Sequence, residues 1–337
     1  MKKSLATLTF TALALSATVI PGLMSRHSAN AASKLNSSRA SVASAASLAA
    51  QDPTLATADT GVILPKTAIY ALNANNVLFV LQPGATSFTR LVNITKADGN
   101  LIGIDFRVSD GLLYAVTDTG SLYTIDLSSA YLGAATKVSS ISPRFAGGFQ
   151  SLMDFNPVLS AIRLIGSNDQ NFAVVNSNGG NLNATAVQTA MTYPAGDVNA
   201  GKDPNISGGA YTNNYVGATV TIFYAVDYDL DTLVTIPPAT AGGSSATGGG
   251  QLQTIGPLVN PKGVPINVSP TADFDIYSDK TTGANSIIGV SGRRLFTIDL
   301  TQINSALQRG QTQNVVVRGI TMPESGGFFI DVAVAPQ

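Results

Sequence analysis

Aspartate is the residue type whose placement in this chain most readily suggests chemistry. The chain has 20 acidic residues, and Glu324 is the single glutamate among them. Four aspartates stand at the same place in four similar segments, each followed by Phe or Val: Asp105, Asp154, Asp273 and Asp331. If they converge, their hard oxygen ligands suit Ca²⁺. The alternative is structural, because a short aspartate side chain readily accepts hydrogen bonds from the backbone of its own segment.

A second candidate metal site is the loop at residues 197–203. It offers oxygen ligands from Asp197, Asn199 and Asp203, near Gly201. The loop is no EF-hand, because it lacks the glycine at the sixth place and has Gly208 where the bidentate glutamate would stand. Turn formation explains the same residues, since Asp, Asn and Gly all favour turns.

Catalytic side chains other than carboxylates are scarce. The chain has no Cys and no Trp, and its one histidine, His27, falls in a segment that we expect to be removed. The mature protein would then lack Ser-His-Asp and Cys-His catalysis and the usual zinc and copper ligands. A glycosidase needs only two carboxyl groups, and Glu324 with one of the four repeated aspartates could supply them.

These observations favour a non-catalytic extracytoplasmic binding or structural module over an enzyme. Two alternatives stay open: a carbohydrate-active hydrolase that uses Glu324, and a calcium-dependent surface scaffold. A cell-surface glycan or protein is the class of partner that fits such a module. The formal net charge is −1 and no basic run occurs, which argues against nucleic acid as a partner.

The N-terminal residues predict export. Lys2 and Lys3 precede an apolar run from Leu5 to about Leu23, and Ala29-Asn30-Ala31 has the small-x-small pattern of a signal peptidase site. We therefore predict a signal peptide at 1–31 and a periplasmic, cell-surface or secreted protein. Residues 32–66 form an Ala/Ser-rich leader or linker. No other stretch approaches the roughly 20 apolar residues of a membrane span.

Short strands separated by Gly, Asn and Asp begin at Thr67 and repeat along the chain. Residues 103–106, 113–116 and 122–126 predict three antiparallel strands joined by tight turns. The pattern recurs from 152, from 210 and from 272, and residues 295–300 repeat 122–127 with one substitution. We expect a fourth, outer strand at 135–139 and another near 315–317.

The two ends of the repeat region complete one another. Residues 67–81 supply only the later strands of a unit, and the missing first strand stands at 329–333. A unit split between the termini is how a β-propeller closes its ring without open sheet edges. The sequence therefore predicts an all-β domain at 67–337, a propeller of five blades, with the repeated aspartates on the strands nearest the central channel.

Several strings, taken together, resemble a bacterial exported family catalogued as domain of unknown function 4394. They are Gly103-Ile-Asp-Phe-Arg107, Asp154-Phe-Asn-Pro157, Tyr193-Pro-Ala-Gly-Asp-Val-Asn-Ala-Gly201, Pro204-Asn205 and Ala210-Tyr-Thr-Asn-Asn214. The resemblance covers about residues 67–336. It implies an exported, β-rich domain and carries no known activity or site residue.

Overall fold

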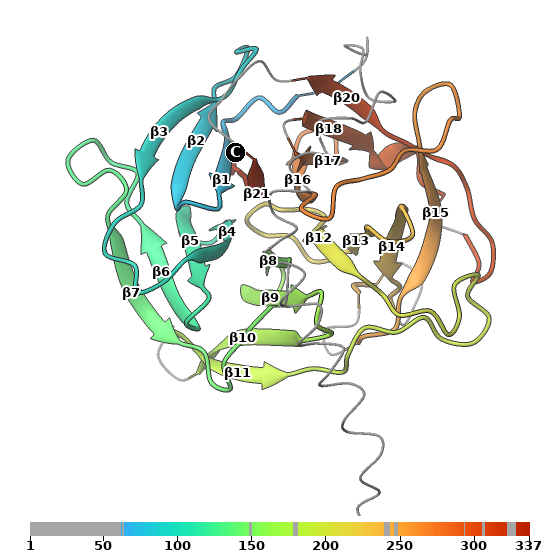
Figure 1. Ribbon diagram of the computed structural model, residues 1–337, viewed down its shortest axis with the longest axis horizontal. Helices are drawn as coiled ribbons and strands as arrows, with labels where there is room; N and C mark the ends of the chain where they lie inside the picture. Colours follow the sequence, from blue (N-terminus) through green and yellow to red (C-terminus); the bar gives the residue numbers. More distant parts are fainter. Residues whose placement is uncertain are drawn as a thin grey trace, which may run out of the picture.

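The chain folds into a ring of five β-sheets (Figure 1). The computed structural model describes residues 62, 64–147, 150–177, 181–238, 243–245, 249–292, 294–304, 307–321 and 328–337. The predicted five-bladed β-propeller is confirmed. The predicted signal peptide at 1–31 and nearly all of the leader at 32–66 lie outside the described residues. Within the described residues, no helix has the length and apolar character needed to cross a membrane.

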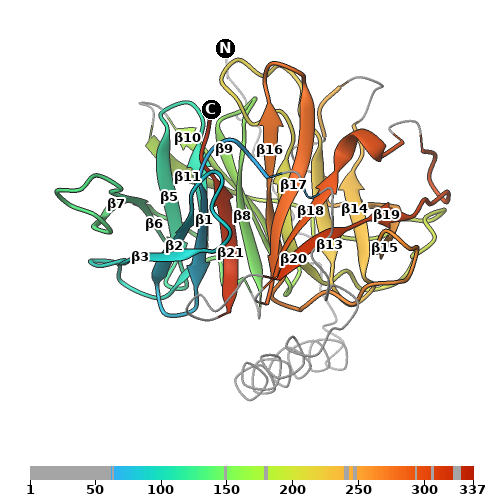
Figure 2. The ribbon, with the colours of Figure 1, turned by 90° about the horizontal axis from the view of Figure 1, so that it is seen from above.

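Each blade is one sheet, and its strands are named here in order from the channel outward. Figure 2 shows the ring from its side. Blade 1 contains β21 (Phe329–Val334), β1 (Ile69–Asn73), β2 (Val77–Leu81) and β3 (Thr89–Asn93). Blade 2 contains β4 (Leu101–Arg107), β5 (Leu112–Thr117), β6 (Ser121–Ile125) and β7 (Ala135–Ser140). Blade 3 contains β8 (Ser151–Asn156), β9 (Ala161–Gly166), β10 (Asn171–Ser177) and β11 (Asn181–Val187).

The last two blades follow the same plan. Blade 4 contains β12 (Ile206–Tyr211), β13 (Phe223–Asp227), β14 (Thr232–Ile236), β15 (Gln253–Val259) and an added strand, β19 (Val315–Val316). Blade 5 contains β16 (Asp273–Asp279), β17 (Ala284–Ser291), β18 (Arg294–Asp299) and β20 (Arg318–Thr321), with a short 3₁₀-helix, η2 (Leu300–Gln302), after β18. The strands nearest the axis are thus β21, β4, β8, β12 and β16 (Figure 1).

The ring closes within blade 1, as the split repeat predicted. β21 pairs antiparallel with β1, with Ile69 opposite Val334 and Tyr70 opposite Ala333. The ring of Phe329 packs against Phe79, with the two centroids 5.4 Å apart. The closure therefore joins the two ends of the domain through both backbone pairing and aromatic packing.

Apolar side chains fill the space between neighbouring blades. Each of the five interfaces has its own cluster of buried residues. Between blades 2 and 3, for example, the rings of Tyr114 and Phe155 pack edge to face with centroids 5.1 Å apart. Alternation along each strand sends successive side chains to opposite faces of the sheet, so every inner strand contributes to two interfaces.

One of the two predicted outer strands is not the fourth strand of its blade. β7 confirms the strand expected at 135–139. The strand expected near 315–317 is β19, which pairs in parallel with β15 as an added, fifth strand of blade 4, and β20 is the fourth strand of blade 5. β19 and β20 are nearly contiguous in the sequence, and no local sequence pattern indicates which sheet each of them joins.

Candidate functional site

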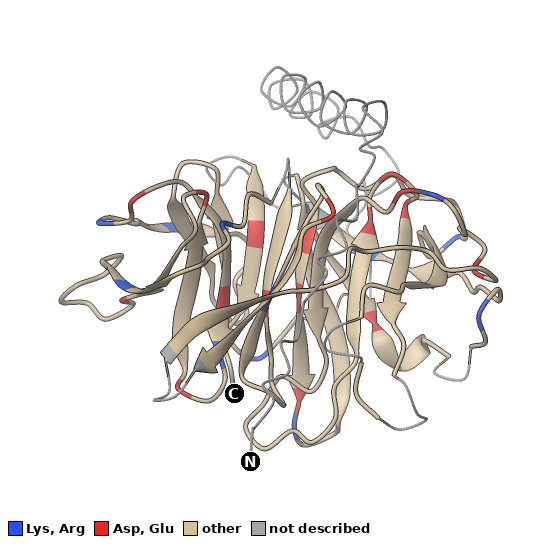
Figure 3. Cartoon of the chain, turned by 90° about the horizontal axis from the view of Figure 1, so that it is seen from below, with Lys and Arg blue, Asp and Glu red and all other residues tan. Residues whose placement is uncertain are grey.

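Five buried aspartates line the axis of the ring. Asp105 lies on β4, Asp154 on β8, Asp273 and Asp275 on β16, and Asp331 on β21, and none is more than 3% exposed. We call these five residues the axial aspartates. Figure 3 shows acidic residues on the strands of the sheets as well as in loops. The four predicted residues Asp105, Asp154, Asp273 and Asp331 thus lie on the innermost strands of their blades.

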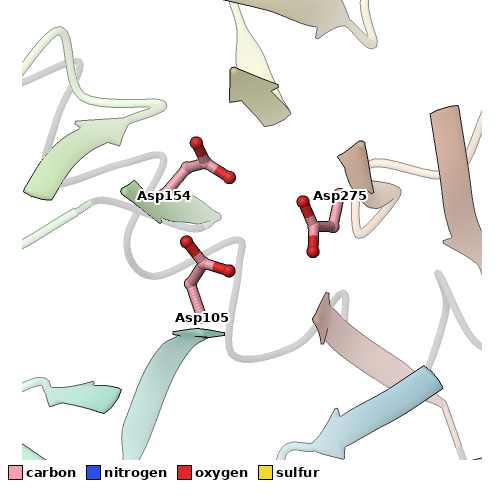
Figure 4. A group of neighbouring side chains, drawn as sticks. All are labelled: Asp105, Asp154 and Asp275. Carbon is pink, nitrogen blue, oxygen red and sulfur yellow. The ribbon is translucent and has the colours of Figure 1, made fainter. Parts of the chain in front are cut away.

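The structure groups the axial aspartates differently from the sequence repeat. Asp105, Asp154 and Asp275 face one another (Figure 4), and carboxylate oxygens of the three lie within 4.8 Å of one another. Asp273, and not Asp275, is the aspartate of this blade that the repeat predicted. Asp331 is instead the carboxyl group that interacts most strongly with Asp273. The two-residue spacing of Asp273 and Asp275, which puts both on one face of a strand, was the available signal for Asp275.

Most axial aspartates accept a hydrogen bond from the next backbone N–H of their own strand. The donor and acceptor atoms are 2.5 to 2.7 Å apart at Phe106 N to Asp105, Phe274 N to Asp273, Ile276 N to Asp275 and Val332 N to Asp331. This is the structural alternative that the sequence raised. It accounts for one oxygen of each of these four carboxyl groups.

The second set of bonds crosses between blades, and the sequence repeat did not predict it. Backbone N–H groups of the next inner strand donate to four of the axial aspartates: Ile104 N to Asp331 Oδ2 at 2.5 Å, Phe155 N to Asp105 Oδ2 at 2.7 Å, Tyr211 N to Asp154 Oδ1 at 3.0 Å and Val334 N to Asp275 Oδ2 at 2.7 Å. We call these the inter-blade Asp bonds. They fasten four of the five blade interfaces close to the axis.

The interface between blades 4 and 5 is the exception. β12 has the sequence Ile-Ser-Gly-Gly-Ala-Tyr and carries no acidic residue. A Cβ atom on Gly208 would stand 2.6 Å from the Cα of Asp273. The two inner strands therefore approach closely there, and glycine allows this approach.

Burial raises the pKa of all five axial aspartates. It raises the pKa of Asp275 to about 6 and that of Asp331 to about 7. Burial first, and the neighbouring carboxylates second, hold the pKa values of Asp105, Asp154 and Asp273 well above the usual range. No ion pair among the described residues includes an axial aspartate. The set therefore retains protons near neutral pH and shares them between its members.

The domain is expected to be more stable at pH 5 than at pH 8. The folded-state pKa values lie above the unfolded value of 3.8, so the stabilising contribution is complete below that value and is lost as pH rises through 6 and 7. A loss of a few kcal/mol corresponds to a melting temperature about 5 to 10 °C lower at pH 8. Thermal unfolding at the two pH values measures it.

A matched variant separates this effect from other titrations. Asp275→Asn removes one titrating group and should reduce the difference in melting temperature between pH 5 and pH 8. Asp98 does not contribute to the difference between the two pH values. Hydroxyl donors, Ser121 foremost, lower the pKa of this partly exposed residue, so it stays ionised from pH 5 to pH 8. A melting temperature that rises from pH 5 to pH 8 would contradict the assignment.

The other predicted sites have different surroundings. Asp197 accepts hydrogen bonds from Thr254 N at 2.8 Å and Thr254 Oγ1 at 2.7 Å, which fasten the 197–203 loop to β15. The Lys202 amine donates to Asn199 Oδ1 at 3.0 Å, and Asp203 is exposed. Within the described part of the chain, the only acidic group compact enough for a metal ion is Asp105, Asp154 and Asp275. Glu324 lies outside the described residues.

Comparison with known proteins identifies a family. A search of curated proteins finds no match. Two solved structures are similar. One is a structural genomics protein of unknown function from Bacteroides thetaiotaomicron, which is 12% identical with a TM-score of 0.44; the match covers 86% of this chain and 71% of that chain. The other is the β-propeller domain of Myceliophteria thermophila Cps50 (Swd1), which is 10% identical with a TM-score of 0.37; the match covers 77% of this chain and 73% of that chain. The family model for the domain of unknown function DUF4394 matches residues 77–321. The chain therefore belongs to the DUF4394 family.

Proposed function

We propose that this protein is a non-catalytic, exported binding or structural module. The observation that carries the proposal is the use of the axial aspartates. Four of them accept N–H groups from a neighbouring blade, and all five are at most 3% exposed. Carboxyl groups that hold the ring together and are shielded from solvent support a rigid scaffold, with partners such as a cell-surface glycan or protein bound by its loops.

The competing hydrolase requires a carboxyl group that reaches the glycosidic bond. A retaining or inverting mechanism needs two carboxyl groups beside the sugar, about 5 to 10 Å apart. Glu324 would have to work with an axial aspartate, and the burial of all five excludes their contact with a sugar in this arrangement. This argues for the non-catalytic proposal over the hydrolase.

A glycan substrate panel tests the proposal. Wild type and Glu324→Gln are incubated with polysaccharides and aryl glycosides, and released reducing ends or aryl alcohols are measured. The expected result is the absence of turnover by either protein, with binding to an immobilised partner unchanged by the substitution. Turnover by wild type that Glu324→Gln loses would overturn the proposal in favour of the hydrolase.

A calcium-dependent scaffold is the second candidate, and one observation favours it. Oxygen atoms of Asp105, Asp154 and Asp275 lie within 4.8 Å of one another, and carboxylate oxygens are the ligands that Ca²⁺ prefers. Each accepting oxygen also has a second lone pair, so the inter-blade Asp bonds do not by themselves exhaust the three groups.

Adding EDTA and calcium arms to the pH series distinguishes the two candidates. A bound Ca²⁺ would stabilise the fold by about 2.7 kcal/mol at a hundredfold excess over its dissociation constant, chiefly at pH 8, where the carboxyl groups are more ionised. The non-catalytic module without calcium predicts the same melting temperature in EDTA and in millimolar Ca²⁺ at both pH values. A rise confined to calcium at pH 8 would instead establish the calcium-dependent scaffold.

A further inference from the structure

The interface between blades 4 and 5 must be held differently from the other four. It is the one without an inter-blade Asp bond, because β12 carries no acidic residue. Its buried apolar cluster includes Ala210 and Val226 from blade 4 and Phe274 and Ile276 from blade 5. Part-buried hydrogen bonds also cross this interface at the end of β12, where Asn213 N donates to Asn285 Oδ1 and Asn214 N donates to Ser278 Oγ, each at 2.9 Å. Because apolar contact is not directional, these bonds and one further element orient the two sheets.

Residues 307–317, which leave blade 5 and return along blade 4, supply that element. We call them the strap. Leu258 and Val259 of β15 pair with Val315 and Val316 of β19. Val317 N donates to Val259 O at 2.8 Å. Val315 and Val317 are buried within the cluster of this interface. The strap thus ties blade 5 to the outer strand of blade 4.

Two further contacts show how closely the strap is seated. Gln313 N donates to Ile255 O at 2.9 Å, and Gln253 Nε2 donates to Leu307 O at 2.8 Å. Gly256 has φ +154°, and a Cβ atom on it would stand 1.9 Å from Gln313 O. Only glycine leaves room for the strap at this point of β15.

The start of the strap is held in place by the charged side chain of Arg309. Arg309 Nη1 donates to Leu252 O at 2.7 Å and lies 3.8 Å from Asp197 Oδ2. The Asp197 side chain is fully buried, whereas that of Arg309 is 28% exposed. Asp197 also accepts hydrogen bonds from Thr254 on β15. One carboxylate therefore joins the 197–203 loop, β15 and the strap.

We propose that the strap is a releasable tie and that the ring opens locally between blades 4 and 5 when the ion pair of Arg309 with Asp197 is broken. The other interfaces are fastened at the axis by buried hydrogen bonds. This one depends on part-buried hydrogen bonds of Asn213 and Asn214 and, near the outer surface, on the strap, whose ion pair water reaches and salt screens. Local opening occurs where the free energy of separation is lowest, and the proposal places that point at the interface between blades 4 and 5.

The chain has no cysteine, so a single introduced thiol reports opening without interference. Ala210→Cys places a thiol on β12 in the interface between blades 4 and 5, and Ala333→Cys places one on β21 in the interface between blades 1 and 2. Both alanines are fully buried on inner strands. Each full-length variant is made with and without Arg309→Gln, and the rate of thiol labelling by a maleimide is measured.

The proposal predicts faster labelling at position 210 than at 333, and a further acceleration at 210 alone, of about tenfold or more, in Arg309→Gln. Lys137→Gln, which breaks the exposed ion pair with Asp98 in blade 2, should change neither rate. Val226→Cys and Val116→Cys, buried at the interfaces of blades 4 with 5 and 2 with 3, repeat the comparison if an alanine variant fails to fold. Equal labelling at matched positions, or equal acceleration at both, would overturn the proposal.

Discussion

A chain that ends at Thr321 is expected to lose cooperative folding altogether. The deletion removes β21, which supplies the inner strand of blade 1, the partner of β1 and the Asp331 bond to Ile104. It also removes Phe329, which packs against both Phe79 and Phe88. The open array that remains exposes the sheet edge of β1 and the inner face of blade 2, and unpaired edges favour aggregation. Circular dichroism against temperature measures the loss.

A shorter deletion is the control. A chain that ends at Ala335 keeps all of β21 and the bond from Ala335 N to Ala68 O, at 2.8 Å. It should melt cooperatively within a few degrees of the full chain. A peptide of residues 328–337, added in trans, should partly restore the melting transition of the longer deletion. An unchanged, cooperative transition in the chain that ends at Thr321 would show that the ring does not depend on its closure.

Replacing Asp105 by alanine is expected to cost about 2 to 5 kcal/mol of unfolding free energy. The change leaves two buried donors, the N–H groups of Phe106 and Phe155, without their acceptor, and each such group costs about 1 to 3 kcal/mol. The measurement belongs at pH 5, because burial holds the pKa of Asp105 well above its usual range. At that pH the loss of charge repulsion cannot offset the lost hydrogen bonds. Urea unfolding gives the difference.

Asp126→Ala is the matched comparison. Asp126 also accepts a backbone hydrogen bond, from Ser128 N at 2.7 Å, in a solvent-exposed turn, where water replaces the lost acceptor. Its cost should stay within about 1 kcal/mol. Equal costs for the two variants would mean that the hydrogen bonds of Asp105 do not hold the ring together.

Local sequence patterns were sufficient to predict the fold. Alternating apolar residues with Gly and Asp turns specify individual strands, and the turn glycines Gly111 and Gly120 have φ of +72° and +84°, as such turns require. The split repeat specified closure, because the first unit lacks its first strand and the C-terminal residues 329–333 supply it. Blade number and ring closure therefore follow from short-range information repeated along the chain.

The inter-blade contacts could not be predicted in the same way. Asp105 and Asp154 were placed correctly at the axis, but which N–H each accepts depends on how far one sheet is rotated against the next. Asp275 was missed because Asp273 stands at the position of the internal repeat that Asp105, Asp154 and Asp331 share, although Asp273 and Asp275 lie on one face of β16. The pairing of Val315 with Leu258 joins distant segments, and no local pattern specifies that register.

Residue-specific amide hydrogen exchange at Phe155 tests the central claim most directly. The Phe155 N–H donates to Asp105 Oδ2 across the interface between blades 2 and 3, so its exchange rate reports an inter-blade Asp bond by itself. In the wild type, the Phe155 amide should be as strongly protected as the amides of the sheet hydrogen bonds beside it. In Asp105→Ala its exchange should accelerate by about tenfold or more relative to those neighbours. A Phe155 amide that exchanges freely in the wild type, or that keeps its protection in the variant, would contradict the role of the axial aspartates in joining the blades.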